Sequence, residues 1–136
     1  METYFIEKDL NVFGTAVTSF PQGIDEAYKK LMAQLGGKFD RPYYGISFMQ
    51  DGKMQYYATV LEIAAGEAEK YHCQRLTIEK GEYLTITVKD WRSKTAQINS
   101  YFHQLIQDDR TDKTKPAVEW YKNEEEMVCM VKTTKK

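Results

Sequence analysis

The chain has 136 residues, of which 42% are hydrophobic and 29% are charged, and its formal net charge is −1. This length suits one domain with one core, and the composition is ordinary for a soluble globular protein. A charge so close to neutral argues against a nucleic-acid-binding surface. We therefore expect no direct contact with nucleic acid.

The cysteine content points to a reducing environment. The two cysteines, Cys73 and Cys129, lie far apart and have no histidine cluster beside them. This spacing argues against a disulfide scaffold or a zinc site. The start of the chain carries no apolar leader, and no apolar run approaches about 18 residues. We expect a cytoplasmic protein without a membrane contact, a metal site or a cofactor.

The first elements are a strand and a helix. Residues 11–20 are rich in Val, Phe and Thr and predict a strand, which residues 21–23 interrupt. Asp25 is then expected to cap a helix that Gly36 and Gly37 end. The apolar residues of this helix recur at helical spacing, at Ala27, Leu31 and Leu35.

Strands follow Pro42. Residues 43–49 and 54–63 are strand-like, and the Asp51-Gly52 pair between them is typical of a tight hairpin turn. Residues 67–70, Glu-Ala-Glu-Lys, are interpreted as an exposed linker between the two halves of the chain.

The second half repeats this order. Residues 74–79 and 83–88 are strand-like around a Lys80-Gly81 turn. Asp90 is expected to cap a second helix that ends at residues 107–109 and has its apolar residues on one face, at Ile98, Phe102, Leu105 and Ile106. A hairpin follows, with strands over residues 116–121 and 127–131.

The correspondence between the halves predicts an internal duplication. Pro42 and Pro116 both precede the first strand of a hairpin, and Asp25 and Asp90 occupy equivalent cap positions. We expect an α+β fold in which a duplicated β-α-β-β unit, about residues 1–66 and 67–136, forms antiparallel sheets with pseudo-twofold symmetry, two helices and a central cleft.

Glu119 stands out because it interrupts an apolar, aromatic strand, Pro116-Ala117-Val118-Glu119-Trp120-Tyr121. A carboxylate that loses water in such a wall costs several kcal/mol or shifts its pKa upward. An internal partner, a bound cation or proton chemistry would compensate for this cost. The alternative is that Glu119 lies on a solvated face of the sheet.

These residues resemble the GyrI-like small-molecule-binding domain, which is also the effector-binding domain of bacterial multidrug-sensing and AraC-type regulators. The resemblance covers nearly the whole chain. It rests on Lys80-Gly81-Glu82-Tyr83, on the helix with Trp91 and Tyr101-Phe102, and on a Pro-x-x-Glu-x-Tyr pattern at Pro116, Glu119 and Tyr121. It implies a cleft between two related halves, in which Glu119 lies among aromatic rings and meets cationic or polar aromatic ligands.

The resemblance also has a departure. Regulators of this kind carry a helix-turn-helix before the domain, whereas the resemblance here begins almost at Met1. We therefore expect a stand-alone GyrI-like domain over residues 1–136, without a helix-turn-helix. We expect it to be a monomer or a weak homodimer.

Alternation along the strands assigns the cleft. Glu119 and Tyr121 share a face with Ala117, so Val118 and Trp120 are expected to point to the helices. Mapping Pro116 onto Pro42 brings Tyr43, Gly45 and Ser47 to the same face, with Gly45 opposite Glu119, where a missing side chain leaves room. Two alternating sets compete for the cleft face of residues 54–63, and they are Tyr57, Thr59 and Leu61 or Tyr56, Ala58 and Val60. We prefer Tyr57. The predicted ligand-binding residues are Glu119, Tyr121, Tyr43, Tyr57 and Trp91.

Two other functions remain open. Some members of the resembled family are hydrolases of electrophilic natural products, and in that case Glu119 and Tyr121 would be the catalytic residues. A third possibility is a gyrase-inhibitor-like regulator that acts through a protein partner. The leading hypothesis is a stand-alone binding domain for small cationic or aromatic molecules.

Overall fold

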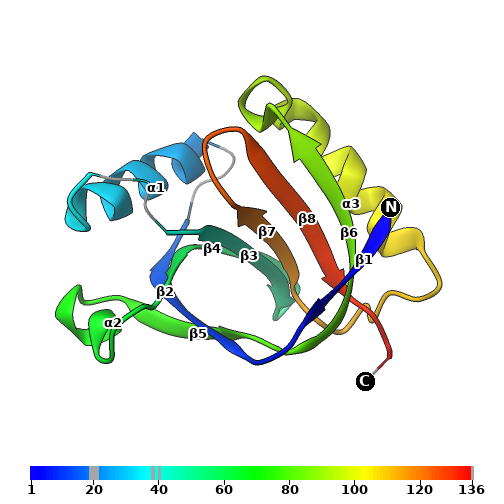
Figure 1. Ribbon diagram of the computed structural model, residues 1–136, viewed down its shortest axis with the longest axis horizontal. Coiled ribbons are helices and arrows are strands. Elements are labelled where there is room, and N and C mark those ends of the chain that lie inside the picture. The colour runs from blue at the N-terminus through cyan, green and yellow to red at the C-terminus, as the bar shows by residue number, and fades with distance from the viewer. Residues whose placement is uncertain (19–21, 38, 40, 136) are drawn as a thin grey trace.

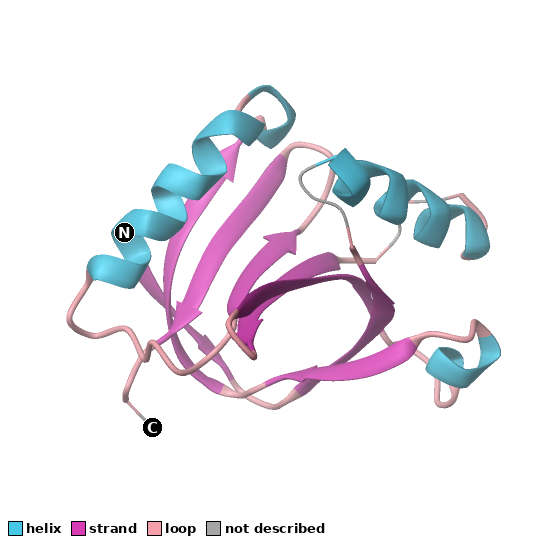
Figure 2. Ribbon diagram, turned by 180° about the vertical axis from the view of Figure 1, so that it is seen from behind, coloured by secondary structure: helices cyan, strands magenta, loops and turns pink. Residues whose placement is uncertain are grey.

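The computed structural model describes residues 1–18, 22–37, 39 and 41–135. Within these ranges, eight strands form one antiparallel sheet that curls into a half-barrel, and the helices lie outside the curl (Figures 1 and 2). The strands are β1 (Glu2–Ile6), β2 (Leu10–Ala16), β3 (Tyr43–Gln50), β4 (Lys53–Leu61), β5 (Gln74–Ile78), β6 (Gly81–Lys89), β7 (Ala117–Tyr121) and β8 (Glu126–Lys132). The helices are α1 (Gln22–Gln34), α2 (Glu67–Lys70) and α3 (Ile98–Gln107), with 3₁₀ turns at η1 (Trp91–Ser93) and η2 (Thr95–Gln97). The fold is thus α+β, as predicted.

The strand order is β1-β6-β8-β7-β3-β4-β2-β5, so β3 and β7 meet at the middle of the sheet. Their pairing places Tyr43 opposite Tyr121 and Gly45 opposite Glu119. Gly45 thus lies opposite Glu119, as the alignment of Pro42 with Pro116 predicts, whereas the pairing of Tyr43 with Tyr121 follows from the antiparallel direction of the two strands. Both prolines stand just before their strands, where the missing N–H removes no ladder hydrogen bond.

The curled sheet buries apolar side chains on both of its faces. The outer face packs against the helices and carries Phe13, Tyr43, Tyr121 and Cys129 beneath Leu31 of α1 and Leu105 of α3. The inner face closes on itself, and its cluster contains residues from the strands and their ends, among them Tyr44, Ile46, Val118, Val128 and Met130.

The expected direction of Val118 and Trp120 was therefore wrong. Both belong to the inner cluster, where Trp120 stacks near Tyr44 at a ring-centroid distance of 6.4 Å. Strand alternation correctly placed both side chains on the face of the sheet that does not carry Glu119. The helices, however, cover the face that carries Glu119, and the curl of the sheet covers the other one.

The helix boundaries differ from those that the caps predicted. Asp25 lies inside the first turn of α1, which begins at Gln22, and forms an ion pair with Lys29 at 3.0 Å. Asp90 has a positive φ of 54° and precedes the 3₁₀ turn at Trp91, while α3 begins only at Ile98. The strand predicted over residues 11–20 ends at Ala16, and its last two residues lie outside the described part of the chain. β1 was not predicted.

Residues 67–70 form helix α2 and are not a simple exposed linker. Glu67 is buried, and its Oε1 accepts hydrogen bonds from Arg41 Nη1 at 2.9 Å and from the backbone N–H groups of Ile63 and Ala64. Arg41 also donates to the Leu61 carbonyl. One carboxylate therefore ties the end of β4 to α2 and to the segment before β3.

None of the helices among the described residues is long and apolar enough to cross a membrane.

Replacing Glu67 by Gln should cost about 2 kcal/mol of unfolding free energy at pH 7, because hydrogen bonds to a charged group become neutral ones. The hydrogen bond from Arg41 is the main cause that lowers the pKa of Glu67 below its usual 4.5. Its contribution to stability is therefore present at neutral pH and is lost as the pH falls through the folded-state pKa. Urea denaturation at pH 7 and below pH 4 would measure both effects.

The matched control is Glu69→Gln, which changes an exposed carboxylate on the same short helix. If Glu67→Gln and Glu69→Gln lower the free energy of unfolding equally at pH 7, this role of Glu67 is contradicted.

Candidate functional site

The candidate site is centred on Glu119, in the middle of β7 on the helix-covered face. Its Oε1 accepts hydrogen bonds from the hydroxyl of Tyr56, at 2.5 Å, and from that of Tyr121, at 3.1 Å. Tyr121 stands two residues along the same strand, and Tyr56 comes from β4, two strands away. Two phenol groups thus meet at one carboxylate oxygen.

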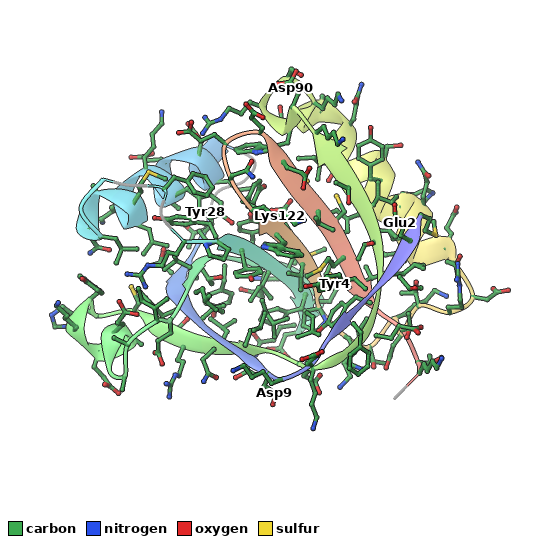
Figure 3. The ribbon with its side chains drawn as sticks, in the orientation of Figure 1. Glu2, Tyr4, Asp9, Tyr28, Asp90 and Lys122 are labelled. Carbon is green, nitrogen blue, oxygen red and sulfur yellow. The ribbon has the colours of Figure 1, made fainter. Side chains whose placement is uncertain are left out.

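A third tyrosine reaches the cluster from α1. The Tyr28 hydroxyl lies 3.0 Å from that of Tyr56, and the Tyr28 ring is edge-on to Tyr121, with 5.5 Å between centroids. Figure 3 shows Tyr28 between α1 and the sheet. When Glu119 is ionised, the one hydroxyl hydrogen of Tyr56 is used on the carboxylate, so Tyr28 is the donor to Tyr56. A chain of hydroxyls therefore runs from α1 to Glu119.

Burial dominates the electrostatics of the site. The loss of hydration raises the pKa of Glu119 above the usual 4.5, and the hydrogen bonds from Tyr56 and Tyr121 offset only part of this. Burial likewise raises the pKa values of Tyr28, Tyr56 and Tyr121 well above 10. The three phenols therefore stay protonated and act as hydrogen-bond donors at physiological pH.

Glu119 has hydroxyl donors but no cationic partner in the described part of the chain, where no lysine or arginine forms a salt bridge with it. The residue as a whole is partly exposed, although its carboxyl group has lost enough hydration to raise its pKa. A partly desolvated carboxylate without a counter-charge attracts cations.

Gly45, directly opposite Glu119, is needed for this arrangement. A Cβ at this position would overlap Tyr56 Oη and Glu119 Oε1. The space that the sequence predicted above Gly45 thus exists, but in this structure the tip of the Tyr56 ring and the carboxylate fill it.

Cys129 lies beside the site, on β8, where it pairs with Glu119 of β7. Its side chain is fully buried, and burial together with the Glu119 charge raises the pKa of its thiol to about 12. A thiol with so high a pKa is not an activated nucleophile. Cys129 is therefore an apolar part of the floor.

Trp91 stands at one end of the site. Its ring is edge-on to Tyr121 at a centroid distance of 4.8 Å, and its Nε1 donates to the Asn123 carbonyl in the β7–β8 turn. The Arg92 guanidinium lies 4.8 Å from the centre of the same ring. The expected proximity of Trp91 to the site is present, although the residue belongs to a 3₁₀ turn and not to α3.

Tyr57 was the wrong choice between the two alternatives for its strand. The structure points Tyr56 toward Glu119, whereas Tyr57 lies on the opposite face and stacks on Phe48 at 5.9 Å. With Phe48 it lines a surface hollow that also involves Gln74, Arg75 and Leu76. The Asp51-Gly52 turn contained the missing signal, since pairing Gln50 with Lys53 across it places Tyr56 opposite Ser47.

The remaining predicted residues share the face of Glu119. Tyr43 and Tyr121 pair across β3 and β7, but Tyr43 is buried beneath Phe39 and Tyr28. Sequence reasoning missed Tyr28 because only its helical spacing to Leu31 marks it as facing the sheet. A ligand role for any of these residues remains a prediction.

Within the described ranges, no group of three or more His, Cys, Asp or Glu side chains is placed to hold a metal ion.

Comparison with known proteins identifies the fold. An integron cassette protein from Vibrio cholerae superimposes with a TM-score of 0.73 at 12% identity, covering 97% of this chain and 94% of that one. The protein SAV2435, solved bound to tetraphenylphosphonium, gives a TM-score of 0.63 at 18% identity, with 96% and 93% covered. A putative transcription regulation protein from Staphylococcus aureus MU50 gives 0.57 at 17% identity, with 96% and 97% covered. No family model and no curated protein sequence matches the chain.

Replacing Glu119 by Gln should raise the melting temperature at neutral pH, because it removes a charge that burial disfavours. The pKa of Glu119 is raised in the folded state, so the folded protein binds a proton more tightly than the unfolded chain. Wild-type stability, relative to that of Glu119→Gln, should therefore fall as the pH rises from about 4.5 through the folded-state pKa. Melting curves of both proteins between pH 4 and 8 would test this, and a constant difference would contradict it.

Replacing Gly45 by Ala should destabilise the protein by about 1–3 kcal/mol, because the added methyl group overpacks the site against Tyr56 and Glu119. Ser47→Ala, two residues along on the same face, is the control and should change stability by less than about 0.5 kcal/mol. Chemical denaturation would measure both variants, and a neutral Gly45→Ala would show that Tyr56 moves away without cost.

Proposed function

We propose that this protein is a binding domain for small cationic or aromatic molecules, with the Glu119 carboxylate as the charge anchor. The observation that carries the proposal is that Glu119 Oε1 is partly desolvated and held by the hydroxyls of Tyr56 and Tyr121. No lysine or arginine in the described part of the chain forms a salt bridge with this carboxylate. A bound cation would supply the missing counter-charge.

The surrounding rings suit such a ligand. Tyr28, Tyr121 and Trp91 form a continuous edge-to-face series beside Glu119. Each ring face that meets a cation adds about 0.5–2 kcal/mol of attraction. Such a site selects charge and flatness more than detailed shape. A ligand enters from the exposed side of Glu119 or takes the place of the Tyr28 ring.

The proposed binding residues follow from the geometry. Glu119 holds the charge, and Tyr121 and Trp91 contribute rings as the sequence predicted, while Tyr43, which is buried, supports the Tyr28 ring from below. Tyr56 takes the part first assigned to Tyr57, and Tyr28 is added from α1. The network keeps the carboxylate in place while no ligand is bound.

We also infer an internal duplication and membership of the GyrI-like family over residues 1–136. The strand order supports the duplication, because β6-β8-β7 on one side of the sheet corresponds to β2-β4-β3 on the other. α1 follows β2, and α3 follows β6, before each hairpin. The fold shared with a tetraphenylphosphonium complex and with a putative regulator supports the family.

Binding is favoured over hydrolysis by the state of the carboxylate. A catalytic base must take a proton from a substrate or a water. Glu119 Oε1 already accepts hydrogen bonds from two hydroxyls, so this oxygen is engaged before any substrate arrives, although burial raises the pKa of the carboxyl group as a whole. The same arrangement leaves the negative charge free to attract a cation.

Tetraphenylphosphonium is a suitable probe, and calorimetry should show binding by wild type that weakens at least about tenfold in Glu119→Gln, or about 1.4 kcal/mol. Only the ionised carboxylate attracts the cation, so wild-type affinity should fall as the pH is lowered through the raised pKa of Glu119. The affinity of Glu119→Gln should stay flat over this range.

The control for this experiment is Glu7→Gln, which removes an exposed carboxylate remote from the site and should bind as wild type does. Equal affinities of Glu119→Gln and wild type at pH 8 would refute the charge anchor.

A further inference from the structure

Two exposed methionines continue the face that carries Glu119. Met49 and Met54 pair directly across the β3–β4 hairpin and are 61% and 49% exposed. Along β3, the positions Gly45, Ser47 and Met49 alternate onto one face, so the methionines stand on the same side as the carboxylate. At about 3.4 Å per residue, Met49 lies about 14 Å from Gly45 along the strand.

The residues between Glu119 and the methionines have small side chains. Ser47 pairs with Ala117, and both are partly exposed. These two positions, which we call the path, carry no long side chain that would separate the carboxylate from the methionine pair. β3 starts beside α1 and runs away from it (Figure 1). The end of β3 that carries Met49 is therefore not under α1.

Single exposed apolar residues are normal on protein surfaces and need no explanation. Met49 and Met54 differ because they are adjacent and aligned with a carboxylate that lacks a salt bridge within the described residues. Methionine is flexible and polarisable, and it adapts to apolar groups of different shapes. The charge at Glu119 selects a cationic head, and the methionines offer contact to an apolar part of the same molecule.

We propose that Met49 and Met54 bind the apolar tail of a monocation whose charged head lies at Glu119. The ligand class is then an elongated amphipathic cation, and the methionine pair determines the preference for tail length. This inference rests on the proposed function, since the head must be bound for the tail to lie along β3.

A series of alkyltrimethylammonium ions tests the inference, from tetramethylammonium through hexyl and octyl to decyl tails, at concentrations below micelle formation. Wild-type affinity should rise by about two- to fourfold per added methylene until the tail spans the path, and then level off. In the double variant Met49→Ser/Met54→Ser, the affinity for tetramethylammonium should be unchanged, and the rise from octyl to decyl, the tails that are long enough to reach the methionines, should be lost.

Ile63→Ser is the matched control, because it removes an equally exposed apolar side chain, 67% exposed, outside the strands of the path. It should keep the wild-type dependence on tail length. Glu119→Gln should weaken the binding of every ion in the series and keep the gain per methylene. Melting curves confirm that each variant is folded.

The outcomes separate the two proposals. If wild type and the methionine variant show the same rise with tail length while Glu119→Gln weakens binding, the tail inference is wrong and the charge anchor stands. If no ion of the series binds wild type, the tail inference is wrong, and the tetraphenylphosphonium titration decides the charge anchor separately. If wild type is a dimer that the methionine substitutions dissociate, the pair contacts a second copy of the chain, and the tail inference is again wrong.

Discussion

The pairing of β3 with β7 joins the two sides of the sheet at its centre, and the site depends on its register. Gly45 faces Glu119, and the absent side chain lets the Tyr56 ring reach the carboxylate from the neighbouring strand. A slip of one residue would move Glu119 to the inner face, among apolar side chains such as Val118. Burial on both faces of the curled sheet therefore specifies the position of the charge.

The balance of charge at Glu119 follows from this geometry. Burial raises the pKa of the carboxyl group, and the hydroxyls of Tyr56 and Tyr121 offset part of the cost without supplying a positive charge. Glu67, in contrast, has a positively charged partner, because Arg41 donates a hydrogen bond to it. This hydrogen bond lowers the pKa of Glu67, whereas the pKa of Glu119 is raised. The two glutamates show the difference between a carboxylate with an arginine partner and one that only hydroxyl groups hold.

Local signals predicted the hairpins well, because the turn at Asp51-Gly52 and the prolines before β3 and β7 act within a few residues. It was harder to predict which face of the sheet each side chain occupies. Tyr56 and Tyr57 are neighbours in an aromatic strand, and only the register across the turn separates them. Glu67 was taken for a solvated linker residue because its partner, Arg41, lies 26 residues earlier in the chain.

The sequence by itself determined the α+β class, the two central hairpins and the singular position of Glu119, because strand alternation and turn chemistry are local properties. Tertiary structure alone decided that the helices cover the face of Glu119, since the curl of the sheet buries the other face. It also decided that the hydroxyls of Tyr28 and Tyr56 extend the hydrogen-bond network of Glu119. Their hydroxyls meet only when α1 packs on β4, and no local pattern encodes a contact between residues 28 positions apart.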